Sequence, residues 1–548
     1  YYEAHQSIYE KSISTYNADG TLAYIAPEQS ALSESTTQNL RQQFTASATY
    51  DKTFGVHGIT ALLGYQQDSY RYDMHSGSRL DFPFSDFPVL DAGGIEGQKS
   101  NGTAKEFALQ SLFGRLNYSL FDRYLFEANV RFDASSRFAS GHRNGVFPSF
   151  SLGWRVSEEK FWKSLKSTVS NLKLRASWGQ LGNQNVGDYY PFASQVNIEG
   201  VNYIFNNKGV SGAAITNMAN KAITWETTTV TDFGVDATLW NKLNVSFDYY
   251  YKKTKDILLQ LDVPLIIGMK APMQNAGVVE NRGWDLSLSY NDKIGDFTYR
   301  ATFNISDVRN KILDMKGVNQ TGLLVNREGE EMNSIYGLKA IGYIQPEDYD
   351  ETGNYKYAKQ FGNFGPGDIK YEDTNNDGTI TSDDRQILGG TIPRYTYGLS
   401  LYGAYKGFDL NLLFQGVGKA NGYIEGHGIQ PFFEGGTVQE QHKDYWTEDN
   451  RHAKFPRLAF NETNNIQYSS FWMKNAAYCR LKNIQVGYTL PKKWLEKCSL
   501  NNVRIYFSGD NLLTISKFWE GFDVEAPVGN GNYYPQVKTI SFGIDVKF

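Results

Sequence analysis

One short acidic segment carries the residues best suited to chemistry. Residues 373–384 read D-T-N-N-D-G-T-I-T-S-D-D. In an EF-hand-type calcium loop, alternate residues of a tight turn point at a hard cation and a glycine permits the sharp bend. Gly378 stands at the glycine position. The spacing therefore predicts a structural Ca²⁺ site formed by Asp373, Asn375, Asp377, Thr379 and Asp384.

A plain turn is the alternative for this segment. Asp384 stands where such loops usually have Glu, and its shorter side chain reaches less far toward a metal. The sequence shows no amphipathic helix on either side, and Asn-Asp-Gly is also a common turn sequence without metal. Both interpretations stay open. In either case the segment belongs to a long connection, 311–393.

Motifs of known enzymes are missing from the chain. Its seven histidines form no H-E-x-x-H pattern, and there is no G-x-S-x-G, P-loop or dinucleotide-binding fingerprint. Cys479 and Cys498 are the only cysteines, so a disulfide framework or a cysteine metal cluster is excluded. We expect no catalytic and no cofactor-binding residues, and no enzymatic activity. The net charge of −5 also argues against nucleic acid as a partner.

The elements that must position the acidic segment are strands. From Gln536 to the terminal Phe548, apolar and polar residues alternate strictly. Such a period of two suits a strand with lipid on one side and a watery lumen on the other. Mean hydropathy is −0.48, yet transmembrane strands need no long apolar run. The apolar face of this strand comprises Ile540, Phe542, Ile544, Val546 and Phe548.

The same alternation recurs along the whole chain. Short polar turns, such as those at 120–123, 240–242 and 405–408, join neighbouring strands on one side. Connections on the other side are long and rich in Gly, Asn and Asp, which is the loop asymmetry of an outer-membrane barrel. Seven hairpins and one strand at each end give about sixteen strands. One short connection, 157–170, is predicted as a helix with Ser157 as its N-cap.

Aromatic residues make up 15% of the chain and gather at two kinds of place. Near predicted strand ends, five tryptophans and a run of three tyrosines suit a membrane-interface belt: Trp154, Trp178, Trp225, Trp240, Trp284 and Tyr249–Tyr251. In the long loops, rings stand beside carboxylates and amides, which suits either sugar or peptide binding or the packing of loops on each other or on a partner protein. The loop segments are 188–192, 430–434 and 518–523.

Taken together, the chain resembles the barrel of a SusC-like TonB-dependent outer-membrane transporter. The segments that carry the resemblance are spread over most of the chain: Gly114–Tyr118, Arg131–Phe138, Phe147–Val156, Leu172–Gly179, Asn275–Asp285, Gly367–Tyr371, Gly509–Leu512 and the terminal strand. Residues 1–106 match weakly, and Val524 replaces a proline that is common in the family. No TonB box or plug domain is visible in the sequence.

The resemblance implies an all-β fold, a transmembrane antiparallel barrel with about 16 of a probable 22 strands. Residues 1–548 would form one partial barrel domain in a Gram-negative outer membrane, in contact with its lipid. The implied function is TonB-dependent import of an oligosaccharide or oligopeptide. The implied partners are a SusD-like surface lipoprotein over the long loops and TonB, acting through a plug domain that this chain does not contain.

Two other functions remain open at this point. Sixteen strands can close around an aqueous channel by themselves, as in a diffusion porin. Pairing between residues 1–14 and 536–548 would favour that porin. A secreted, calcium-stabilised β-protein for adhesion is the third interpretation, and extraction without detergent would favour it over both membrane interpretations.

Overall fold

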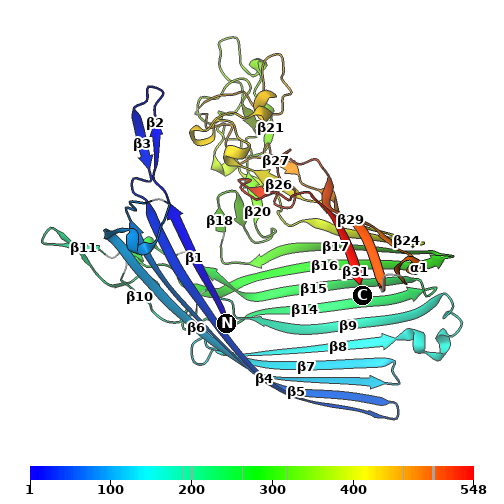
Figure 1. Cartoon of the computed structure of the whole chain (residues 1–548). Helices are drawn as coiled ribbons and strands as arrows, with labels where there is room; N and C mark the ends of the chain where they lie inside the picture. The colour runs from blue at the N-terminus through cyan, green and yellow to red at the C-terminus, as the bar shows by residue number, and fades with distance from the viewer. Residues whose placement is uncertain are drawn as a thin grey trace.

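The computed structural model describes residues 1–84, 86–187, 189–198, 202–261, 263–317, 319–460, 462–496 and 500–548. Asp188 and Cys498 lie outside these residues. The main element is one antiparallel sheet, curved into a trough (Figure 1). Its sixteen strands confirm the expected number and follow the order β1 (Tyr2–Glu10), β4 (Ala31–Phe54), β5 (His57–Leu80), β6 (Gly94–Leu120), β7 (Tyr124–Ser135), β8 (Asn144–Arg155), β9 (Val169–Asn183), β14 (Glu226–Leu239), β15 (Leu243–Gln260), β16 (Met273–Ile294), β17 (Phe297–Asp314), β24 (Arg394–Tyr405), β25 (Phe408–Lys419), β28 (Tyr478–Thr489), β29 (Asn502–Ser516) and β31 (Thr539–Lys547).

The sheet has two free edges. Strand β1 pairs with β4, and β31 pairs with β29. Among the described strands no pairing joins β1 to β31, so these sixteen strands do not close on themselves. The contact between the terminal strands that a self-contained porin requires is therefore not found.

Tight turns set the register at one end of the sheet. Leu120 and Leu239 each accept a hydrogen bond from the backbone N–H three residues later, at 3.0 and 2.9 Å. The two residues inside each turn have positive φ, as do Lys406 and Gly407 between β24 and β25. Turns with two positive φ values match the right-handed twist of the strands that they join. Because a slip by one residue would exchange the two faces, these turns fix which side chains point outward.

The connection between β8 and β9 differs from the expected helix. It contains two 3₁₀ turns, η2 (Val156–Glu158) and η3 (Lys160–Trp162). The predicted N-cap, Ser157, is buried, and its hydroxyl donates to Asn171 Oδ1 at 3.1 Å instead of capping a helix. A tertiary hydrogen bond of Ser157 thus replaces the local N-cap hydrogen bond that the sequence predicted. The described residues contain a single α-helix, α1 (Lys492–Leu495), and no helix long and apolar enough to cross a membrane.

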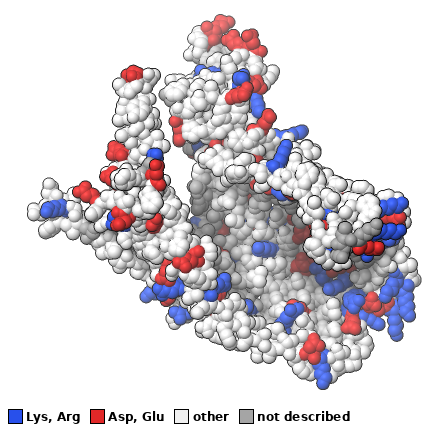
Figure 2. All heavy atoms as spheres, in the orientation of Figure 1, with Lys and Arg blue, Asp and Glu red and all other residues white. Residues whose placement is uncertain are grey.

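The two faces of the sheet differ in chemistry. Large apolar side chains stand exposed on the convex face, among them Leu152, Phe233, Phe247 and Ile505. Their neighbours along each strand point into the trough, where both basic and acidic side chains are visible (Figure 2). The sheet is a single layer, so its apolar residues do not meet across two stacked sheets. This arrangement excludes a β-sandwich.

The long connections lie at the end of the strands opposite the short turns (Figure 1). Three of them, 315–393, 420–477 and 517–538, pack into one compact unit, which we call the loop body. It contains β18 (Asn319–Thr321), β19 (Leu324–Asn326), β20 (Ser334–Gly337), β21 (Ala340–Tyr343), η5 (Pro346–Asp348), β22 (Ile369–Tyr371), η6 (Ser382–Asp384), β23 (Gln386–Gly389), β26 (Asn421–Ile424), η7 (Gly426–Gly428), η8 (Phe433–Gly435), η9 (Glu440–Lys443), β27 (Met473–Asn475) and β30 (Val528–Gly529).

Smaller elements occupy the remaining long connections. They are the hairpin β2 (Ile13–Tyr16) and β3 (Leu22–Ala26), η1 (Leu90–Ala92), the pair β10 (Val196–Asn197) and β13 (Ala214–Ile215), the hairpin β11 (Asn202–Phe205) and β12 (Lys208–Ser211), and η4 (Leu265–Ile267). The β2–β3 hairpin projects from the same end of the strands as the loop body (Figure 1), and most of its side chains are open to solvent.

Candidate functional site

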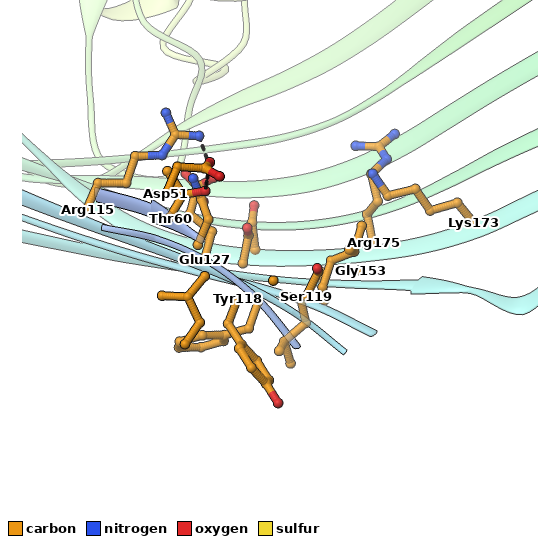
Figure 3. A pocket seen from close by; sticks show the side chains of 18 of the residues that line it. Asp51, Thr60, Arg115, Tyr118, Ser119, Glu127, Gly153, Lys173 and Arg175 are labelled. Carbon is orange, nitrogen blue, oxygen red and sulfur yellow. Dashed lines mark hydrogen bonds and ion pairs between the residues drawn. The ribbon is translucent and has the colours of Figure 1, made fainter. Parts of the chain in front are cut away.

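A polar band crosses the trough near the short turns. The register places one side chain from each of seven successive strands in a single row, because each pairs directly with the next. This row lines a cavity of about 650 Å³ (Figure 3). A wall of hydroxyls, amides and carboxylates is suited to contact with water or a polar chain. The row is Asp51, Thr60, Asn117, Glu127, Ser151, Ser177 and Asp232.

Arginine–carboxylate pairs continue this chemistry along the trough. Arg175 on β9 contacts two carboxylates of neighbouring strands, Asp236 at 2.7 Å and Asp248 at 2.9 Å. Such pairs hold long side chains against the wall and leave the trough open. Four further pairs lie on the same face: Arg41 with Asp68, Arg115 with Glu127, Arg131 with Asp133, and Arg504 with Asp409.

The loop body has a core of its own. Trp472 is fully buried and contacts Phe471, Phe455 and Trp519, with ring centroids 4.9, 6.4 and 6.5 Å away. Its indole N–H donates to the carbonyl oxygen of Asn465 at 2.9 Å. Because these residues come from two connections, the core joins segments that are distant in sequence. The loop body is therefore a folded unit rather than a set of separate loops.

An ion pair with a buried carboxylate reinforces the loop body. Asp368 has no exposed surface, and Arg457 contacts both of its carboxylate oxygens at 2.7 Å. Asn465 and the backbone N–H of Gly365 each donate to the same carboxylate, both at 2.8 Å. Every carboxylate oxygen thus has a partner, which a buried charge requires.

His442 is a buried titratable group in the same unit. Its Nδ1 accepts a hydrogen bond from the backbone N–H of Gln439 at 2.9 Å, and its Nε2 lies 3.0 Å from the carbonyl oxygen of Ile429. Because that carbonyl can only accept, the single proton is on Nε2. Burial lowers the pKa of His442, so the ring is neutral and ties two loop segments together.

The predicted calcium loop is an ordered turn with one unpartnered oxygen. Gly378 N–H donates to Asp373 Oδ2 at 2.9 Å, Asp377 N–H to Asn375 Oδ1 at 2.9 Å, and Thr379 N–H to Asp377 Oδ1 at 2.8 Å. Asp373 Oδ1 is buried and has no hydrogen-bond partner. Within the described ranges, no group of three or more His, Cys, Asp or Glu side chains is arranged to hold a metal.

Asp384 is more deeply buried than the other four predicted calcium ligands. It is fully buried, and its two oxygens accept the backbone N–H groups of Thr374 and Thr381, each at 2.8 Å. These hydrogen bonds lower the pKa of Asp384 although its burial opposes them. Asp384 therefore closes the loop from inside, whereas Asn375 Nδ2 donates to Asp377 Oδ2 at 3.0 Å on the outer side of the turn.

The aromatic segments of the long loops pack against the protein itself. Trp519 lies in the core of the loop body, with Phe518 and Phe522 against it. Tyr189 stacks on Tyr70 at 6.4 Å between ring centroids. Phe432 contacts Phe460, at 5.7 Å. Of the two expectations for these segments, loop packing is the one that their contacts match.

Three of the five tryptophans expected in an interface belt, Trp154, Trp178 and Trp240, are exposed. Trp284 is half-buried in the interior of β16. Trp225 is only 6% exposed, because it packs between Phe138 and Phe147, at 5.3 Å from each. Sequence position alone could not separate Trp225 from the others, since its partners come from β8 and from the connection that precedes β8.

The family comparisons agree with this architecture. A family model described as "TonB dependent receptor-like, beta-barrel" matches residues 2–512. TonB-dependent receptor P3 of Formosa agariphila is 31% identical over 94% of this chain and 52% of its own length. TonB-dependent receptor SusC of Bacteroides thetaiotaomicron is 30% identical over 80% of this chain and 44% of its own. The chain thus spans about half the length of the curated relatives it matches.

Solved structures show the same fold. The RagAB peptide transporter superposes with a TM-score of 0.81 at 24% identity, covering 100% of this chain and 59% of that chain. The "open-open" state of the RagAB peptide importer gives a TM-score of 0.82, also at 24% identity, over 58% of that chain. This similarity shows that the strands of this chain are arranged as in those structures, that is, the fold alone.

Proposed function

The chain belongs to the TonB-dependent receptor-like β-barrel family and lies in the outer membrane, and we propose that it forms most of the wall of an importer for bulky nutrients. The observation that carries this proposal is the contrast between the two faces of the sheet. An apolar convex face suits acyl chains, and the polar band from Asp51 to Asp232 suits a hydrated passage. The nutrient would be an oligosaccharide or an oligopeptide.

Two partners belong to this proposal. A SusD-like surface lipoprotein would cover the long-loop end, from which the loop body and the β2–β3 hairpin both project, the hairpin with Ile13, Tyr16, Leu22 and Tyr24 exposed. TonB would act through a plug domain outside this chain, and that domain would occupy the trough. The relatives named SusC and RagAB support a partnership of this kind.

Uptake by whole cells tests the proposal. We expect deletion of the gene to abolish uptake of labelled oligomers of one class, sugar or peptide, and to leave uptake of the corresponding monomers unchanged. Deletion of TonB should give the same loss. Uptake that continues without TonB would mean passive diffusion and would overturn the import mechanism.

We further propose that the loop 373–384 binds Ca²⁺ through Asp373, Asn375, Asp377 and Thr379, with Asp384 holding the loop closed. The buried, unpartnered Oδ1 of Asp373 supports this, because an oxygen without a donor is available to a cation. Sites in extracellular modules bind calcium with dissociation constants of about 0.1–1 mM. Saturation at roughly ten times that constant would stabilise the loop by about 1.4 kcal/mol.

Limited proteolysis checks the calcium proposal. Calcium should slow cleavage within 373–384 about tenfold in the unchanged protein, and a chelator should reverse the effect. The variant Asp373→Ala/Asp377→Ala should be cut rapidly with or without calcium. Asp350→Ala is a matched control, because Asp350 also accepts local hydrogen bonds from Thr352 and Asn354. Equal cleavage of the unchanged loop in calcium and in chelator would contradict the proposal.

A further inference from the structure

A groove lies on the convex face of the sheet, near the short turns of β7, β8, β9 and β14. Its volume is about 540 Å³. Ala176 pairs with Leu152 on one side and with Phe233 on the other, so a methyl group stands between two large exposed side chains. The wall is therefore hollowed at Ala176. The convex-face side chains that line the groove are Tyr124, Leu152, Trp154, Leu174, Ala176 and Phe233.

Polar groups mark the end of the groove nearest the turns. Tyr124 Oη donates to Glu159 Oε1 at 2.6 Å, and Trp154 Nε1 donates to the same oxygen at 3.2 Å. Arg123 contacts Glu159 Oε2 at 3.4 Å. Both rings therefore line the groove with their polar ends turned to the β8–β9 connection. This is the orientation of aromatic side chains at the level of lipid headgroups.

The β8–β9 connection beside this rim is basic and carries exposed apolar side chains. Residues 155–166 contain four basic residues and two acidic ones, and basic side chains gather at this end of the strands in Figure 2. Lys160 and Lys163 are exposed and take part in no ion pair among the described residues. Phe161 is 65% exposed and Leu165 48% exposed. Exposed apolar groups among unpaired lysines fit the boundary between acyl chains and headgroups.

We propose that the groove and the β8–β9 connection bind one anionic phospholipid of the periplasmic leaflet. An acyl chain would lie over Ala176 between Leu152 and Phe233, and the phosphate would lie at Lys160 and Lys163. The short turns of an outer-membrane barrel face the periplasm, which places the lysines at the headgroups of that leaflet. This proposal relies on the position of the barrel in the membrane, and it does not depend on which nutrient is imported.

Native mass spectrometry of the purified protein in detergent tests the site with phosphatidylglycerol and phosphatidylethanolamine of matched acyl chains. We expect tighter binding of phosphatidylglycerol. Lys160→Gln/Lys163→Gln should weaken that binding roughly tenfold or more, because each lysine near an anionic lipid surface contributes to attraction. Lys406→Gln/Lys492→Gln, at other short turns, is the matched control and should bind as the unchanged protein does.

Ala176→Phe tests the acyl-chain half of the site. Filling the groove should lower phosphatidylglycerol binding about tenfold or more, whereas Ala128→Phe, on the same face outside the groove, should have little effect. Heat-modifiable gel migration verifies that both variants fold. Unchanged binding by the folded Ala176→Phe protein or by the double lysine variant would overturn the proposal. Displacement of the lipid by inorganic phosphate alone would also overturn it, because the site would then recognise a free anion.

Discussion

Replacing Trp472 by alanine is expected to destabilise the loop body by about 3–5 kcal/mol, the usual cost of removing a buried large aromatic side chain. The substitution leaves a cavity among Phe455, Phe471 and Trp519 and removes the hydrogen bond to the carbonyl oxygen of Asn465. Hydrogen exchange in the loop body should accelerate strongly, whereas exchange in the strands of the sheet should stay unchanged.

Tyr534→Ala is the control for this prediction. Tyr534 is 87% exposed in one of the connections that form the loop body, so its loss removes an aromatic ring without opening a cavity. Its effect should stay within about 0.5 kcal/mol. If Trp472→Ala and Tyr534→Ala gave the same exchange pattern, the three connections would not share a core.

The second large effect is expected from Arg457→Met. This change leaves the carboxylate of Asp368 buried without its cationic partner, and breaking a buried ion pair in this way costs about 3–5 kcal/mol. Adding Asp368→Asn should recover part of the loss, because a neutral amide needs no counter-charge. Protease resistance of the loop body measures both effects.

An exposed ion pair supplies the comparison. Arg451 contacts Glu347 at 2.8 Å, also between two loop segments, but the side chain of Glu347 is 67% exposed whereas that of Asp368 is fully buried. Arg451→Met should therefore cost no more than about 1 kcal/mol. Equal losses for Arg451→Met and Arg457→Met would contradict the structural role assigned to the Asp368 pair.

The barrel wall could be predicted from the sequence because alternation is a local property. In each strand, the alternation of apolar and polar residues tells which side chains share a face, as it does from Ile540 to Phe548. The short turns can be recognised in the sequence by their length. Counting such segments gave the number of strands. The helix predicted for the β8–β9 connection was wrong, because the buried hydroxyl of Ser157 donates a hydrogen bond to Asn171 and does not cap a helix. No local sequence pattern contains that contact.

The loop body could not be predicted for a related reason. Its core joins residues such as Leu338, Tyr423 and Trp519, which lie in three separate connections. Aromatic residues beside polar ones look alike in sequence whether they meet a ligand or each other. Likewise, the acidic spacing of 373–384 predicted the turn, but only the structure distinguishes the buried Asp384 from the other residues of the set.

The account rests on which face of the sheet meets lipid, and strand β15 allows the most direct measurement. In a protein without Cys479 and Cys498, single cysteines would replace Asn244 to Tyr249 in turn, in lipid vesicles. A water-soluble thiol reagent should react at 244, 246 and 248, and a fluorophore at 245, 247 and 249 should be quenched by a bilayer-restricted quencher. Uniform labelling along the strand, or the opposite alternation, would contradict a barrel wall with lipid outside and water within.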